Sequence, residues 1–316
     1  MNGSKLDSAV KILPQSLRSA ISQITPSSKQ QINEIRLRLY KPLTISTFSG
    51  EYALSSAGDL VDTMSKDAVM VYEYDIETVI TRVFKNSLYS YKNELTAGYM
   101  TYDGGCRIGF CGTAVVNTDN RCSIENIKNI SSVNIRIPRE IVGCADEIYT
   151  SMFSDGLKGL LICGAPASGK TTLLRDLTRL IGNRYKVSLI DERGEIAASV
   201  KGKAQNDIGV LTDVFNSYSR YYGIMTAVRV MSPKAIVCDE IGSDDDLIAL
   251  KYAVNSGVKI IASCHTDSVD DIKSKPIISE LIKYDVFDYC VFLGRNGKVE
   301  KITDMRNKKC LSLQAV

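Results

Sequence analysis

One segment of the sequence has the residue types and the spacing of a phosphate-binding loop. Residues 164–171 read Gly-Ala-Pro-Ala-Ser-Gly-Lys-Thr, which is a complete G-x-x-x-x-G-K-T pattern. Glycines at these spacings let the backbone turn its N–H groups toward an anion, and a following helix adds the positive end of its dipole. We therefore predict a nucleotide site whose binding residues are Gly164, Ala165, Pro166, Ala167, Ser168, Gly169, Lys170, Thr171 and Thr172.

Two carboxylates at the end of an apolar run supply the second half of such a site. Residues 235–238 read Ala-Ile-Val-Cys and are followed by Asp239 and Glu240. Beside a phosphate loop, an Asp at this place holds Mg²⁺ through water, while the loop threonine, here Thr171, is a direct ligand. Lys170 is expected to reach the β- and γ-phosphates. Because Glu240 can polarise an attacking water, we predict hydrolysis rather than binding alone.

Two further candidates follow other apolar runs. The single histidine, His265, directly follows one run, and the acidic segment 191–195 (Asp-Glu-Arg-Gly-Glu) follows another. Because ligands of open α/β folds bind at the carboxyl ends of the strands, we predict that His265 senses the γ-phosphate or orients water. Glu192 is our candidate for ordering water, although the sequence leaves open whether Asp191 or Glu195 does so instead. A charged turn that caps the strand is the alternative.

Short aliphatic runs that alternate with helical patterns must position these residues. From about residue 159 the runs are 160–163, 187–190, 235–238 and 259–264. Continuous apolar runs of this kind are typical of a parallel sheet buried on both faces. Three aspartates, 244–246, begin the next helical pattern, and we expect them to interact with the helix dipole rather than to act in catalysis.

The first half of the chain has a mixed pattern. We expect a helix over 5–23 that is broken at Pro14, and a strand over 35–45 in which Pro42 indicates an edge or a bend. A helix along 76–88 and strands at 99–102 and 106–116 follow. The predicted architecture is therefore an α/β chain with a RecA-like P-loop ATPase domain, mostly parallel in its sheet. A smaller mixed α+β domain precedes it, with residues 1–143 in the first domain and 144–316 in the second.

Composition excludes several classes of protein. The chain has 316 residues, of which 44% are hydrophobic, and a net charge of +3. Such an even balance argues against nucleic acid as a partner. No apolar run approaches the ~18 residues that cross a bilayer, and the start lacks a secretory signal, so we expect a cytoplasmic protein. The nine cysteines include no CxxC pair. Four of them, Cys163, Cys238, Cys264 and Cys290, lie in or beside apolar runs, and we expect these to be buried reduced thiols rather than metal ligands.

With these motifs placed, the sequence resembles the stage III sporulation protein AA family of endospore-forming bacteria, which are relatives of the secretion ATPases. The resemblance spans nearly the whole length. It rests on the phosphate loop and on residues 32–38, 102–109, 134–139, 191–195, 229–233 and 239–242.

The resemblance implies more than the residues do. Secretion ATPases form hexameric rings that bind ATP between two domains, and an arginine from the N-terminal domain or from a neighbour approaches the γ-phosphate. Arg136 and Arg139 are the candidates here, and Arg229 lies in an arginine-containing stretch. The family's acidic box corresponds to residues 191–195 and its histidine box to His265. In two places the chain departs from the pattern: Gly242-Ser243-Asp244 and Leu211 stand where relatives carry an arginine.

The function predicted from the resemblance is an ATPase that uses ATP and Mg²⁺ to power assembly or transport through a channel between mother cell and forespore. It implies a homo-oligomeric ring and an integral membrane partner, which holds the protein at the mother-cell face of the membrane. Two alternatives stay open at this point. One is a ring scaffold that binds ATP with negligible hydrolysis, and the other is a nucleic-acid motor.

Overall fold

The computed structural model describes residues 2–84, 98–116, 124–266, 268–294, 297–305 and 309–311. The chain divides into two compact units, Met1–Glu140 and Ile141–Val316. Each is treated by itself below. The domain boundary at residue 143 stays a prediction.

The helices of the first unit are short and amphipathic. They are α1 (Asn2–Lys11), α2 (Gln15–Gln23), α3 (Pro26–Lys29) and α4 (Glu73–Phe84). Pro14 separates α1 from α2, as predicted, because a proline inside a helix removes a hydrogen bond and clashes with the preceding turn. Of the helix expected over 76–88, residues 85–88 lie outside the described part of the chain.

The sheet of the first unit is antiparallel throughout. Its order is β4-β3-β2-β1-β7-β6-β5. Its strands are β1 (Glu34–Arg38), β2 (Thr44–Ser46), β3 (Glu51–Leu54), β4 (Leu60–Val61), β5 (Tyr99–Tyr102), β6 (Cys106–Val116) and β7 (Ile124–Arg136). The strands predicted at 99–102 and 106–116 are confirmed, and a short 3-10 turn, Asp103–Gly105, joins them.

The single strand expected over 35–45 is two strands, and the proline at which an edge or a bend was expected lies in the reversal between them. That segment folds back on itself, and β1 pairs with β2 in an antiparallel hairpin. The reversal occurs where Tyr40 has a left-handed backbone (φ 57°) and where Pro42 has no N–H to donate to a ladder.

One face of this sheet carries the core of the first unit. Residues of β1, β6 and β7 that alternate along the strands pack against α1, α2 and α4, for example Ile35, Ile108 and Ile135. The intervening residues point to the other face, where Arg136 lies opposite Glu34 in register.

The second unit contains an eight-stranded sheet. Its order is β10-β9-β11-β12-β8-β13-β14-β15, and the first six strands are parallel. The strands are β8 (Leu160–Gly164), β9 (Val187–Asp191), β10 (Thr212–Asn216), β11 (Ala235–Cys238), β12 (Lys259–His265), β13 (Tyr289–Leu293), β14 (Val299–Asp304) and β15 (Lys309–Leu311). All four predicted apolar strands are confirmed, and sequence reasoning missed β10 and β13.

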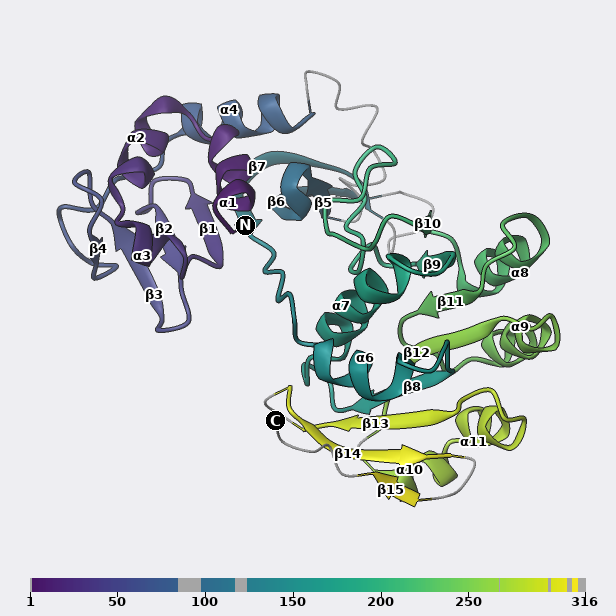
Figure 1. Cartoon of the computed structure of the whole chain (residues 1–316). Coiled ribbons are helices and arrows are strands. Elements are labelled where there is room, and N and C mark those ends of the chain that lie inside the picture. The colour runs from purple at the N-terminus through teal and green to yellow at the C-terminus, as the bar shows by residue number, and fades with distance from the viewer. Residues whose placement is uncertain are drawn as a thin grey trace. The chain divides into compact units, whose positions relative to one another are not determined.

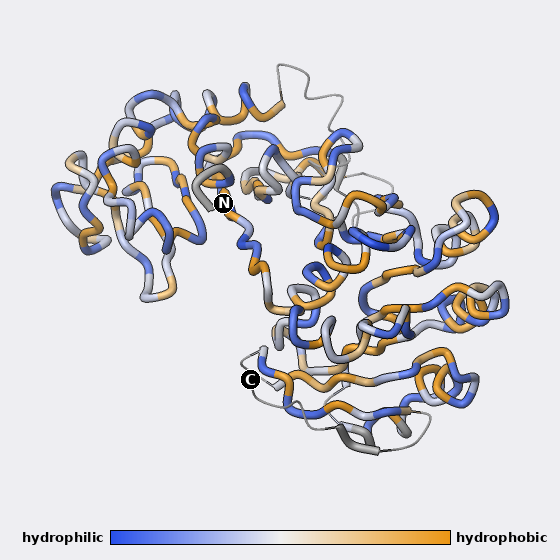
Figure 2. The backbone as a smooth tube through the Cα atoms, in the orientation of Figure 1, coloured by the Kyte–Doolittle hydropathy of each residue, from blue (hydrophilic) through white to orange (hydrophobic). Residues whose placement is uncertain are grey.

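Helices cover both faces of this sheet (Figure 1). They are α6 (Asp146–Phe153), α7 (Lys170–Gly182), α8 (Arg220–Val230), α9 (Asp244–Asn255), α10 (Val269–Ser274) and α11 (Pro276–Lys283). Leu160 and Ile162 of β8 pack with α6 and α7, whereas Leu161 and Cys163 pack with α8, α9 and α11. Burial on both faces explains the continuous apolar strands, which are orange along β11 and β13 in Figure 2.

The cysteines expected to be buried do lie in this core. They are Cys163, Cys238, Cys264 and Cys290, all present as free thiols. The Cys163 sulfur lies 3.5 Å from that of Cys264 and 3.2 Å from that of Cys290. Burial raises the pKa of the Cys163 thiol well above its usual range, so this thiol packs as a small neutral hydrophobe.

Candidate nucleotide site

The phosphate loop leaves the carboxyl end of β8 and turns into α7. Gly164 is paired with His265 of β12 on one side and with Leu293 of β13 on the other. A Cβ atom at Gly164 would lie 2.5 Å from the Ser168 hydroxyl and 2.9 Å from the Leu293 carbonyl, so no side chain fits there. Gly169 has a left-handed backbone (φ 92°) and lies directly before the helix. The glycines of the pattern are therefore required by close approach and by the turn.

Two buried polar groups of the loop are suited to binding an anion. The ammonium of Lys170 is folded back and donates to the carbonyls of Gly164 at 2.9 Å and Ala165 at 2.7 Å. Ser168 is 2% exposed, and its hydroxyl has no hydrogen-bond partner among the described residues. A buried hydroxyl without a partner is costly, and a phosphate oxygen would satisfy it. The loop thus fits a phosphate chain.

The first carboxylate after β11 meets the loop directly. The hydroxyl of Thr171 donates to Asp239 Oδ2 at 2.7 Å. The other oxygen, Oδ1, accepts from the Ser263 hydroxyl and from the Glu240 N–H. A hydroxyl beside a carboxylate offers the oxygen donors that Mg²⁺ prefers, and Mg²⁺ usually takes few protein ligands together with substrate phosphates. The residues present fit this ion.

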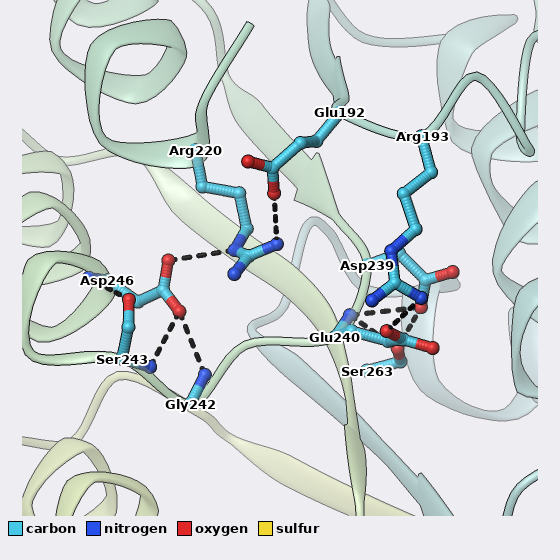
Figure 3. Close-up of polar contacts among 9 residues, drawn as sticks. All are labelled: Glu192, Arg193, Arg220, Asp239, Glu240, Gly242, Ser243, Asp246 and Ser263. Atoms are coloured by element: carbon cyan, nitrogen blue, oxygen red, sulfur yellow. Dashed lines mark hydrogen bonds and ion pairs between the residues drawn. The ribbon is translucent and has the colours of Figure 1, made fainter. Parts of the chain in front are cut away.

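Glu240 is held at both of its carboxylate oxygens. Nε2 of His265 lies 3.1 Å from Oε1, and the Arg193 guanidinium lies 2.5 Å from Oε2. Since an ionised carboxylate only accepts, His265 must donate from Nε2. The other ring nitrogen, Nδ1, is buried without a partner in the described part of the chain. Figure 3 shows Arg193 reaching from the turn after β9 to Glu240, a contact that sequence reasoning missed although Arg193 lies in the acidic segment.

The structure gives two acids of segment 191–195 different surroundings. Asp191 is 3% exposed and accepts hydrogen bonds from the N–H groups of Glu195, Ile196 and Ala197. Burial raises the pKa of Asp191 despite these bonds, which oppose the effect. Glu192 instead forms an ion pair with Arg220 at 2.5 Å. Asp191 therefore anchors the turn, and Glu192 belongs to a second network.

That second network joins three elements of the site edge. Arg220, at the start of α8, donates to Asp246 Oδ1 at 2.8 Å as well as contacting Glu192. Asp246 Oδ2 accepts the N–H groups of Gly242 and Ser243, and Ser243 and Asp246 form a capping box on α9 (Figure 3). Although burial acts to raise the pKa of Asp246, the bonds from Arg220 and the backbone hold it below its ordinary value. Asp246 thus fixes the loop that follows Glu240.

Of the three candidate arginines, Arg136 and Arg139 belong to the first unit and Arg229 to the second. Arg136 ends β7 with its side chain 69% exposed and 4.0 Å from Glu34. The Arg139 guanidinium donates to the Gln30 carbonyl and lies 3.9 Å from the centre of the Phe48 ring. Arg229 is exposed in the last turn of α8, which returns to the amino edge of the sheet, so the fold does not bring it to the phosphate loop of its own chain.

Comparison with known proteins places the sequence among sporulation proteins. The family model described as "Sporulation stage III, protein AA" matches residues 4–313. The protein from Bacillus subtilis (strain 168) named Stage III sporulation protein AA is 32% identical over 308 residues, which cover 95% of this chain and 95% of that protein. Similarity of this extent includes both units.

Comparison with solved structures identifies the fold. The pilus retraction motor PilT with bound ADP has a TM-score of 0.56 and 15% identity, covering 87% of this chain and 76% of that chain. The Legionella pneumophila ATPase DotB has a TM-score of 0.51 and 14% identity, covering 84% and 73%. At such identities the likeness shows the fold alone, and it confirms the predicted RecA-like P-loop architecture. None of the helices within the described ranges is long and apolar enough to span a bilayer.

Proposed function

The chain belongs to the sporulation stage III, protein AA family, and from this premise we propose that it is a Mg²⁺-dependent ATPase. In this proposal it powers assembly or transport through a sporulation channel between mother cell and forespore. The observation that carries the enzymatic part is the 2.7 Å hydrogen bond between Thr171 of the phosphate loop and Asp239, directly followed by Glu240. That bond brings the predicted phosphate, metal and water sites to one edge of the sheet.

The side chains have separable tasks in this proposal. Lys170 exchanges its loop carbonyls for phosphate oxygens, and the backbone N–H groups before α7 face the same charge. Thr171 and Asp239 hold Mg²⁺, which when bound neutralises charge on the phosphate oxygens. Glu240 orients the attacking water and accepts its proton, while His265 fixes the position of the carboxylate through Oε1.

An assembled ring completes the site in the proposal. A homo-oligomer, hexameric as in the secretion ATPases, would let Arg136, Arg139 or Arg229 reach the phosphates of another subunit. The protein would act in the cytoplasm at the mother-cell face of the membrane, held there by an integral membrane partner. Such a site turns over only when assembled.

A scaffold that binds ATP with negligible hydrolysis is the second candidate. It is favoured by the state of Glu240, whose two carboxylate oxygens are both engaged by side chains of the same chain. In that state each oxygen already accepts one N–H, which leaves the carboxylate fewer lone pairs with which to orient water. ATP binding would then serve only to hold a ring together.

Phosphate release by the purified protein separates these candidates. We would compare wild type with Lys170→Ala and Glu240→Gln over a concentration series, while following the mass of the oligomer. Turnover that rises with concentration and is lost in both variants supports the enzyme. Binding and assembly without turnover, in the presence of Mg²⁺, would leave the scaffold as the function of the isolated protein.

A further inference from the structure

Arg193 differs from the other basic side chains at this edge of the sheet. Its side chain is 63% exposed, and its guanidinium contacts Glu240 Oε2. Arg220 is only 19% exposed and is shared between two carboxylates. The Arg175 guanidinium donates to the carbonyls of Glu195 and Ile196. Arg193 is thus the most exposed of these cations, and it contacts the residue on which hydrolysis would depend.

The backbone around Arg193 holds its base in place. Two residues earlier, the Asp191 carboxylate accepts three backbone N–H groups of the same turn. The next residue, Gly194, has a left-handed backbone (φ 64°). The Arg193 side chain therefore extends from a fixed backbone position, and its exposure leaves the guanidinium accessible from solvent.

An ion pair with one exposed partner exchanges more readily than a buried pair, because water screens the attraction and the long Arg193 side chain must be ordered to hold it. A terminal phosphate carries more negative charge than a carboxylate, and two of its oxygens can accept a bidentate pair of hydrogen bonds from the planar guanidinium. When the terminal phosphate of ATP lies beside Glu240, Arg193 has a stronger partner available than the carboxylate.

We propose that Arg193 binds the terminal phosphate of ATP within its own subunit and releases Glu240 as it does so. Without a terminal phosphate, Arg193 occupies Oε2 of Glu240. With ATP bound, Arg193 contacts the phosphate, and Oε2 is free to orient water while His265 retains Oε1. The inference rests on the proposed function and names the residue that distinguishes ATP from ADP.

Equilibrium binding of two nucleotides tests this role without relying on turnover. We would titrate wild type and Arg193→Ala with ADP and with a non-hydrolysable ATP analogue, each with Mg²⁺. Arg193→Ala should weaken the analogue about tenfold, the effect of one lost charge-assisted hydrogen bond, and should change ADP affinity less than about twofold. Arg193→Lys should recover part of the affinity for the analogue.

A double-mutant cycle tests the exchange itself. Glu240→Gln should tighten binding of the analogue, partly by removing repulsion and partly by releasing Arg193. The tightening should be smaller in the Arg193→Ala background, because only the loss of repulsion remains there. Equal tightening in both backgrounds would show that Glu240 and the terminal phosphate do not compete for Arg193.

Arg184→Ala is the matched control, because Arg184 is exposed beyond the end of α7 and contacts the Tyr149 hydroxyl. It should leave both affinities at the wild-type values. If wild type binds the analogue and releases phosphate but Arg193→Ala keeps the same preference for analogue over ADP, the inference fails and the ATPase stands. If wild type binds neither nucleotide, the proposed function fails, and this inference with it.

Discussion

At the scale of one residue, Glu240 has a strained backbone that its neighbours hold in place. Its backbone lies in the left-handed region (φ 53°), which costs a residue with a Cβ about 1–2 kcal/mol. Such a conformation persists only where the surroundings fix it, and here the N–H of Glu240 is held by Asp239 and Ser263. The strain points the carboxylate toward His265 and Arg193, so the position of this group is set by its neighbours rather than by local preference.

His265 gives a prediction at the same scale. We expect His265→Ala to lower the maximal rate of ATP hydrolysis about tenfold or more with little change in KM, because Glu240 loses the donor that positions it. His265→Gln should restore much of the rate, since an amide N–H can donate to the same oxygen. Steady-state kinetics of the three proteins measure this. A glutamine variant as slow as the alanine variant would contradict a positioning role.

At the scale of elements, the Arg220 network connects the ends of three segments of the second unit. Arg220 begins α8, Glu192 follows β9, and Asp246 caps α9. The loop from Glu240 to α9 is thereby tied to the turn that carries Arg193. A displacement of the turn after β9 would therefore move the loop after Glu240, and the reverse, because the Arg220 guanidinium contacts both.

Arg220→Ala should therefore destabilise the fold. Asp246 would be left buried without its cation, and removing one partner of a buried pair costs about 3 kcal/mol. Because Arg220 and backbone bonds lower the pKa of Asp246 in the folded state, the contribution of its ionised form is present above the ordinary value of 3.8. That contribution is lost as the pH falls through the lower folded pKa.

Urea denaturation at about pH 7 and about pH 3 checks this prediction. The difference between wild type and Arg220→Ala should be largest at the higher pH and should shrink at the lower one. Arg184→Ala, which removes an exposed arginine, should match wild type at both. A difference that stays constant with pH would mean that Asp246 is not the group through which Arg220 stabilises the protein.

At the scale of the whole molecule, the two units have separate cores. The antiparallel sheet of the first packs against α1, α2 and α4, and the sheet of the second is covered on both faces by its own helices. The phosphate loop, Asp239, Glu240, His265 and Arg193 all belong to the second unit, whereas Arg136 and Arg139 belong to the first. We therefore expect the second unit to bind nucleotide by itself and the first unit to be needed for assembly-dependent turnover.

Residues 141–316 produced alone test that separation. We expect this fragment to unfold in one cooperative transition and to bind Mg²⁺-ADP, because its core and phosphate loop are complete. Its turnover should not rise with concentration, since Arg136 and Arg139 are missing. Thermal unfolding, ADP titration and phosphate release measure the three properties. Concentration-dependent turnover by the fragment would remove both arginines from the mechanism.

The sequence by itself determined the parts of this protein that depend on local order. The phosphate loop has to follow a strand and open a helix, and the apolar runs of a sheet buried on both faces are visible without any contact being known. The first hairpin was not visible in this way, because residues 35–45 alternate as one strand until Tyr40 and Pro42 reverse the chain. The same holds for β10, whose exposed residues give no apolar run.

Only the tertiary structure decided how the acids and the cations are paired. In the sequence, Asp191, Glu192 and Glu195 remain alternatives for ordering water, and nothing pairs any of them, or Glu240, with a particular cation. The fold gives Asp191 to the backbone, Glu192 to Arg220, and Glu240 to His265 and Arg193. Pairing energies depend on distance and burial between residues that lie far apart in the sequence, as Thr171 and Asp239 do with a separation of 68 positions. The spacing of residues along the sequence does not give these distances or this burial. Only the folded structure therefore shows which acid pairs with which cation.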